Sequence, residues 1–202
     1  MIAVIDYDAG NIKSVEKALQ YLGCECVTTR DEAVITGAGH VILPGVGAFG
    51  DAMGRLEEYG LVDVIRKVCD MGIPFLGICL GLQLLFEDSE ESPGVRGLSI
   101  LKGSIRRLPE DKGLKVPDIG WNSLKLQNDG RLFKGIEDES FVYFVHSYYL
   151  DAADKSIVKA SIDYGVTVDA SVESGNVFAC QFHPEKSSDT GLKILENFLN
   201  VH

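Results

Sequence analysis

The stretch that decides the fold reads Pro74-Phe75-Leu76-Gly77-Ile78-Cys79-Leu80-Gly81-Leu82-Gln83. Its first half is typical of a buried strand and its second half of a helix, with Cys79 at the turn between them. Glycines two residues before and after this cysteine form the pattern of a nucleophile elbow, with sulfur in place of a serine oxygen. Side chains at the glycine positions would collide with neighbouring backbone. The stretch therefore predicts a cysteine nucleophile at a helix N-terminus, where the dipole favours the thiolate.

Strands and helices alternate on either side of this elbow. Apolar runs predict strands at 2–6, 24–28, 40–43 and 75–78, and helical spacing predicts helices at 12–22, 49–59, 61–71 and 188–199. Such alternation is typical of a mainly parallel sheet covered by helices on both faces. We therefore expect an α/β fold.

The second half of the chain has a different pattern, with short apolar runs separated by turn residues. It predicts strands at 100–101, 105–108, 123–126, 141–145, 158–162, 166–172 and 177–180. We expect these strands to form an antiparallel β extension of the same sheet. With 202 residues and no linker or repeat, residues 1–202 are predicted to form a single domain.

The composition limits the functions to consider. A formal net charge of −11 disfavours nucleic acid and anionic membranes as partners. Neither a basic N-terminal signal nor a membrane-length apolar run is present, and the 5 cysteines follow no secreted framework, so a reducing cytoplasm is expected. Cys24 and Cys26 are expected to be strand residues, because no second Cys or His pair lies near them; no metal is expected.

A cysteine nucleophile needs a base, and histidine is the usual one. His183 is followed two residues later by Glu185, and residues two apart in an extended segment point to the same side. Glu185 can therefore orient the imidazole, which is the logic of a catalytic triad. His146 has no such neighbour in sequence, His40 precedes a buried strand at the wrong end, and His202 is the last residue. The sequence favours His183.

Attack on a carbonyl group also needs N–H donors for the oxyanion. The N–H of Leu80, directly after the nucleophile, is one natural donor. The second donor is expected from the loop Pro44-Gly45-Val46-Gly47, because its glycines let the backbone turn an N–H group toward a ligand.

These residues resemble a known family. Gly77-x-Cys79-x-Gly81-x-Gln83 with His183-Pro184-Glu185 resembles the class I (triad) glutamine amidotransferases, and the resemblance runs along essentially the whole chain. Residues 44–47, 120–122, 144–148 and 183–187 are together similar to the glutaminase subunits of imidazole glycerol phosphate synthases. Asp118-Ile119 stands where His-Met would be expected, which affects local contacts and not the family.

The resemblance implies a mechanism and a set of roles. Cys79 would attack the side-chain amide carbon of glutamine, His183 would protonate the leaving ammonia and then activate water against the thioester, and Glu185 would orient His183. The oxyanion would be held by the N–H groups of Val46 and Leu80. The glutamine would be bound by Gly47, Gln83, Ser147 and Tyr148.

The resemblance also implies a partner. Ammonia would pass through a tunnel to a (β/α)8-barrel cyclase subunit, which makes imidazole glycerol phosphate and aminoimidazole carboxamide ribotide in histidine biosynthesis. Contacts with this partner are expected at Trp121, Asn122 and Lys186 and at the helix that starts near Asn11. An acidic chain suits this arrangement, because the phosphorylated substrate would be held by the partner. No cofactor is implied.

Two other interpretations stay open. The chain could be another class I amidotransferase, a γ-glutamyl hydrolase or a cysteine peptidase on the same sheet, which the 44–47 loop and Trp121-Asn122 disfavour. It could also be a non-catalytic regulatory module with a vestigial elbow. The intact Cys79, His183 and Glu185 disfavour that interpretation.

Overall fold

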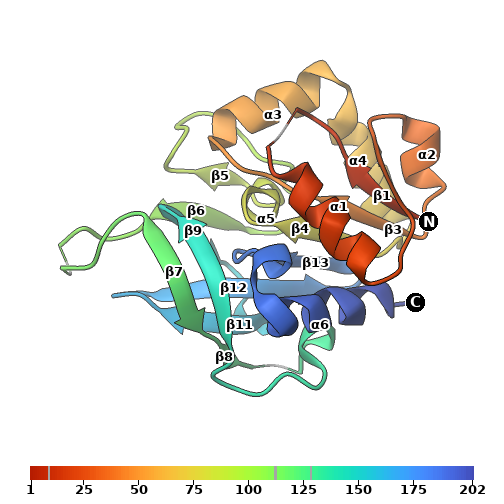
Figure 1. The fold of residues 1–202 in the computed structure, drawn as a ribbon. Helices are drawn as coiled ribbons and strands as arrows, with labels where there is room; N and C mark the ends of the chain where they lie inside the picture. Colours follow the sequence, from red (N-terminus) through yellow and green to blue (C-terminus); the bar gives the residue numbers. More distant parts are fainter. Residues whose placement is uncertain (9, 112, 128) are drawn as a thin grey trace.

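The fold is built on one mixed sheet (Figure 1). The computed structural model describes residues 1–8, 10–111, 113–127 and 129–202, and within them an eight-stranded sheet has the order β2-β1-β3-β4-β13-β12-β11-β8. The parallel strands are β2 (Cys26–Thr29), β1 (Ile2–Ile5), β3 (His40–Leu43), β4 (Phe75–Ile78) and β13 (Val177–Cys180). The antiparallel strands are β12 (Thr167–Ser174), β11 (Val158–Asp163) and β8 (Lys125–Leu126). The predicted parallel sheet with an antiparallel extension is confirmed.

Helices cover both faces of this sheet, as predicted. One hydrophobic core contains side chains of α2 (Glu32–Thr36), α3 (Phe49–Glu58) and α4 (Leu61–Asp70), and the other contains side chains of α1 (Ile12–Tyr21) and α6 (Ser188–Leu199). In β1, Ile5 belongs to the first core and its neighbour Val4 to the second. Both faces are buried, which explains why the parallel strands are apolar throughout.

Two smaller sheets flank the main one. Strands β10 (Tyr148–Ala152), β6 (Gly103–Arg107) and β5 (Asp88–Ser89) form one of them, and β7 (Asp118–Ser123) pairs with β9 (Phe141–His146) in the other. Short 3-10 turns lie at Arg131–Phe133, Lys155–Ile157 and Pro184–Lys186. Among the described residues, no helix has both the length and the apolar character needed to span a membrane.

The sequence prediction was wrong in parts of this extension. Residues 100–101 form no strand, since Leu101 instead donates its backbone N–H to Leu85 in a loop. The strand predicted at 123–126 is divided at the buried Leu124, where β7 ends and β8 begins. Strands β5 and β10, residues 118–122 of β7, and helix α2 were not predicted. Their mixed polar sequences acquire a strand or helix pattern only through their partners in the fold.

Candidate active site

The elbow lies at the carboxyl end of β4, in the middle of the main sheet. Cys79 has φ 55° and ψ −109°, an unusual conformation for a residue with a side chain, and α5 (Leu80–Leu84) begins directly after it. A Cβ atom at Gly77 would lie 2.6 Å from the carbonyl oxygen of Gly81, and one at Gly81 would clash with the carbonyl oxygen of Leu43. The predicted strand-turn-helix is present, and its glycines allow the close approach that the prediction required.

The neighbouring strand brings His183 and Glu185 to the elbow. Strand β13 pairs with β4 in parallel, and the N–H of Cys79 donates to the carbonyl oxygen of Cys180 at 2.8 Å. Three residues later, His183 Nδ1 lies 2.8 Å from Glu185 Oε1, with both side chains buried. The predicted pairing is present, but the extended segment from which we predicted it is not: Pro184–Lys186 form a 3-10 turn, and in this turn the Glu185 carboxylate lies beside the imidazole.

Electrostatics favour the protonated form of His183. Burial lowers the pKa of the imidazole, but its interactions with Cys79 and with the Glu185 carboxylate outweigh burial and raise the pKa to about 9. Because a carboxylate can only accept, Nδ1 donates to Glu185 and the other ring nitrogen is left for Cys79. The imidazole therefore holds a proton near the cysteine at neutral pH.

Asn11 joins this pair in a way the sequence did not show. Its Nδ2 donates to Glu185 Oε1 at 2.6 Å, so one carboxylate oxygen accepts from both Asn11 and His183. Asn11 holds a left-handed backbone conformation, φ 73°, at the start of α1. We predicted Asn11 at a partner interface, and the structure places its amide on the carboxylate that orients His183.

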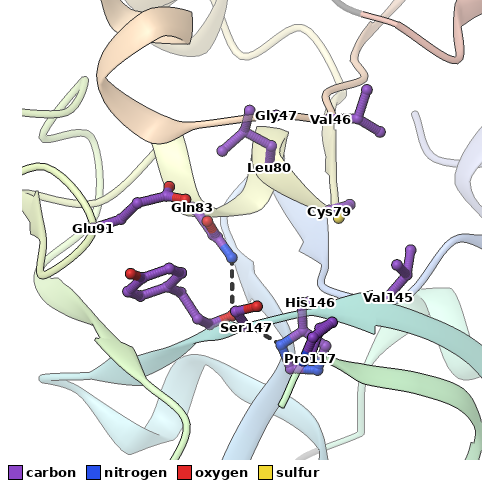
Figure 2. Close-up of a pocket in the computed structure, with 11 residues that line it drawn as sticks. Val46, Gly47, Cys79, Leu80, Gln83, Glu91, Pro117, Val145, His146 and Ser147 are labelled. Atoms are coloured by element: carbon purple, nitrogen blue, oxygen red, sulfur yellow. Dashed lines mark hydrogen bonds between the residues drawn. The ribbon is translucent and has the colours of Figure 1, made fainter.

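A pocket of about 270 Å³ opens beside Cys79 (Figure 2). The residues predicted to bind substrate and oxyanion all line it: Val46, Gly47, Leu80, Gln83, Ser147 and Tyr148. It is completed by Glu91, Pro117, Val145 and His146. Segments that are far apart in the chain thus form one cavity at the elbow.

The amide of Gln83 is engaged within the protein. Its Nε2 donates to the backbone oxygen of Tyr148 and to Gln181 Oε1, both at 3.0 Å. Gln181 in turn donates from Nε2 to Cys79 Sγ at 3.7 Å. We predicted no role for Gln181, although it lies two residues before His183. In an extended segment that spacing puts both side chains on one side, which was the available signal.

One predicted oxyanion donor is occupied in this structure. The N–H of Leu80 donates to the carbonyl oxygen of Gly45 at 3.4 Å. The buried hydroxyl of Tyr7 donates to the carbonyl oxygen of Pro44 at 2.8 Å and so fixes the start of the loop, while Val46 is exposed. The loop therefore covers the donor that an oxyanion would need.

His146 has a carboxylate partner in the fold that its neighbours in sequence do not supply. Asp118 on β7 lies opposite His146 on β9, and Asp118 Oδ2 is 3.5 Å from His146 Nε2, with both side chains buried. His146 Nδ1 lies 2.8 Å from the backbone oxygen of Tyr148. Cross-strand register creates this pair, and sequence spacing gives no signal for it.

Glu91 is a further pocket residue that the sequence did not indicate. Its carboxylate accepts the N–H of Phe49 at 2.7 Å, and its side chain lines the cavity that contains Cys79. A carboxylate in a pocket wall can pair with an ammonium group.

No cluster of His, Cys, Asp and Glu in the described ranges is arranged to hold a metal ion.

Of the other residues predicted at a partner interface, Trp121 and Asn122 lie on β7, and Lys186 follows His183 by three residues. Trp121 is 48% exposed and packs edge-on against Tyr143, whose backbone oxygen accepts the N–H of His183. Asn122 donates to Asp118 Oδ2 at 2.9 Å. Lys186 is exposed. Trp121 and Lys186 are thus free to contact another protein, whereas the side chain of Asn122 is engaged with Asp118.

Comparison with known proteins identifies the family. Residues 3–201 match the model of the family described as glutamine amidotransferase class-I. The chain belongs to the class-I glutamine amidotransferases. A curated relative from Bacillus cereus, named imidazole glycerol phosphate synthase subunit HisH, is 53% identical over 201 residues, which cover 100% of this chain and 95% of the relative. One from Moorella thermoacetica with the same name is 51% identical, with 98% and 93% covered.

Solved structures of other amidotransferases have the same fold. A structure described as a glutamine amidotransferase has a TM-score of 0.76 at 22% identity, with 98% of this chain and 99% of that chain covered. PurLQS from Thermotoga maritima has a TM-score of 0.75 at 22% identity, with 98% and 97% covered. This class-I amidotransferase therefore has the same fold as proteins with which it shares only about a fifth of its residues.

Proposed function

We propose that this class-I amidotransferase hydrolyses glutamine to glutamate and ammonia, with Cys79 as nucleophile. The observation that carries the proposal is the buried His183–Glu185 pair, at 2.8 Å, beside a cysteine in elbow geometry. Membership of the family and full-length relatives named as synthase subunits support the same reaction.

The residues perform the reaction in two stages. Cys79 Sγ attacks the amide carbon of glutamine, and the His183 imidazolium gives its proton to the departing ammonia, leaving a thioester. Water then attacks the thioester while His183 takes up a proton, and glutamate and free thiol are released. A pKa of about 9 keeps His183 protonated for the first stage. Glu185 holds the ring in the required tautomer.

The pocket suits one amino acid molecule. Its volume of about 270 Å³ is close to the lower limit of ligand pockets. The Glu91 carboxylate would pair with the α-ammonium group of glutamine. Gly47, Ser147 and Tyr148 would hold the rest of the glutamine head group. The amide nitrogen of Gln83 already donates to Tyr148 and Gln181, so Gln83 would chiefly hold the pocket wall in place.

The oxyanion hole would be completed by a movement of the 44–47 loop. Val46 and Leu80 are the proposed donors, and the N–H of Leu80 donates to Gly45 in this structure. Turning the loop would release this N–H and direct that of Val46 toward the substrate. We therefore propose low turnover in the isolated chain and faster turnover when a partner is engaged.

The partner we propose is the cyclase subunit of imidazole glycerol phosphate synthase, a (β/α)8 barrel. The relatives are named as a subunit of that synthase, which supports a second subunit. Ammonia would pass to it for synthesis of imidazole glycerol phosphate and aminoimidazole carboxamide ribotide in the cytoplasm. The contact with the cyclase would be formed by Trp121, Asn122, Lys186 and the region around Asn11.

Replacing Cys79 tests the central claim. In Cys79→Ala, glutamate formation should vanish in the complex with the cyclase, while the circular dichroism spectrum and melting temperature stay near those of the parent. Cys180→Ala, a buried cysteine on the adjacent strand, is the matched control and should retain turnover. Native-rate hydrolysis by Cys79→Ala would rule out the mechanism. Equal turnover with and without the cyclase and its nucleotide would remove the proposed activation.

A further inference from the structure

A continuous chain of buried polar groups connects strand β7 with Cys79. Starting from the cysteine, Gln181 Nε2 donates to Sγ at 3.7 Å, and Gln181 Oε1 accepts from Gln83 Nε2 at 3.0 Å. The same Gln83 nitrogen donates to the backbone oxygen of Tyr148 at 3.0 Å. Gln83 and Gln181 are 5% and 0% exposed, so solvent does not compete for these bonds.

The chain continues from Tyr148 to β7. His146 Nδ1 lies 2.8 Å from the same Tyr148 oxygen, and His146 Nε2 lies 3.5 Å from Asp118 Oδ2. Figure 2 marks the bonds that Gln83 and His146 make to this part of the pocket wall. Asn122 Nδ2 donates to the same Asp118 Oδ2 at 2.9 Å. Asp118 itself does not line the pocket.

Every group in this chain has its direction set by its neighbour. The Tyr148 carbonyl can only accept, so His146 Nδ1 and the Gln83 amide nitrogen both donate to it. Because Gln83 Nε2 donates to Gln181 Oε1, the amide of Gln181 is oriented with its oxygen toward Gln83 and its nitrogen toward the sulfur of Cys79. At the other end, His146 Nε2 faces the Asp118 carboxylate at 3.5 Å and has no hydrogen-bond partner among the described residues.

We propose that Asp118 and His146 are positioning residues for Cys79. Acting through the Tyr148 carbonyl, Gln83 and Gln181, they keep a hydrogen-bond donor on the sulfur and so favour the reactive thiolate. Asp118 begins the strand that carries the exposed Ile119 and Trp121. A cyclase bound to those side chains would act on the nucleophile along this route. The inference rests on the proposed function for the role of Cys79 and for the partner.

The test measures the reactivity of Cys79 without substrate. Asp118→Leu keeps the size of the side chain and removes its hydrogen bonding. In the full-length variant we expect iodoacetamide to alkylate Cys79 about threefold to tenfold more slowly than in the parent, with a similar fall in kcat for glutamine. The rate of alkylation is measured by mass spectrometry of the peptide that contains Cys79. A direct effect of charge predicts the reverse, because loss of a nearby carboxylate favours the thiolate.

A double-mutant cycle tests the route itself. If Asp118 acts through Gln181, then Asp118→Leu combined with Gln181→Leu should be alkylated no more slowly than Gln181→Leu alone. Asp118→Asn, whose amide can pair with a neutral His146, should stay within about twofold of the parent and guards against a Leu variant that fails to fold. Faster alkylation in either Asp118 variant, or independent effects in the cycle, would overturn the proposal.

Asp169→Leu is the matched control. Asp169 is also 3% exposed, and its carboxylate accepts from the backbone N–H of Ala152 and from Lys155, neither of which belongs to the series of polar groups between Asp118 and Cys79. We expect a comparable loss of thermal stability with unchanged alkylation of Cys79; slowed alkylation here would assign the Asp118 effect to general loosening. Failure of the proposed function has a different signature, since Cys79→Ala would then retain glutamine hydrolysis while the alkylation results stood.

Discussion

The two sides of the active site are built differently. The proposed reacting groups, Cys79 and His183, come after the ends of β4 and β13, adjacent parallel strands that are buried on both faces. The opposite wall, with His146, Ser147 and Tyr148, comes from β9, the start of β10 and the residue between them. The first side is enclosed by two hydrophobic cores, whereas Ser147 and Tyr148 are half-buried at the pocket.

The two sides differ in how firmly they hold their side chains. The parallel side holds its groups in place by close backbone approach, as at Gly77 and Gly81, and leaves little freedom for movement. The antiparallel side is joined to an exposed strand, and its polar contacts are made across strands. We infer that the parallel side holds the groups that react, while the loops beside the antiparallel side set binding and the antiparallel side adjusts the reactivity of Cys79 when a partner is engaged.

The largest effect expected from this comparison is on binding. Glu91→Gln removes the charge proposed to pair with the α-ammonium group of glutamine, so KM should rise about tenfold to a hundredfold with kcat nearly unchanged. Initial rates over a range of glutamine concentrations measure both constants. Glu90→Gln, an exposed neighbour, should keep KM within about twofold. A fall in kcat with unchanged KM would place Glu91 on the chemical side and break the comparison.

A second prediction concerns pH and the parallel side. Because the pKa of His183 is raised to about 9, its imidazolium form exists below that value and is lost as pH rises through it. The kcat for glutamine should therefore fall by about tenfold per pH unit above the folded-state pKa. Steady-state rates between neutral and strongly alkaline pH check this. In Glu185→Gln the fall should begin at lower pH; a kcat that stays constant across the alkaline range would contradict the assignment.

The smallest effect is expected at Asn11. Asn11→Ala removes one of the two donors to Glu185 Oε1 and leaves the other, so kcat should fall by about threefold to tenfold with little change in KM. The measurement is made on the isolated chain and on the complex with the cyclase. A loss seen only in the complex would assign Asn11 to the interface alone and not to the triad. Lys13→Ala, an exposed position on the same helix, is the control.

The parts of the site that could be predicted share one physical property. The elbow and the His183–Glu185 pair are each encoded within a few consecutive residues, where backbone geometry alone decides which side chains meet. The pocket residues Gly47, Ser147 and Tyr148 came from resemblance to a family, and the structure brings them together. Glu91 could not be found in this way, because its place in the pocket depends on how the 91–97 segment folds against α3.

Local patterns of the sequence are enough to predict the mainly parallel sheet, the strand-turn-helix at Cys79 and the pairing of His183 with Glu185, because periodicity and short spacing act over a few residues. Three other contacts depend on the folded chain as a whole: Asp118 faces His146, Asn11 donates to Glu185, and Gln181 donates to the sulfur of Cys79. Those contacts join residues far apart in the chain through strand register and loop packing. A one-residue change in register would reverse which side chains meet, so no local pattern can specify them.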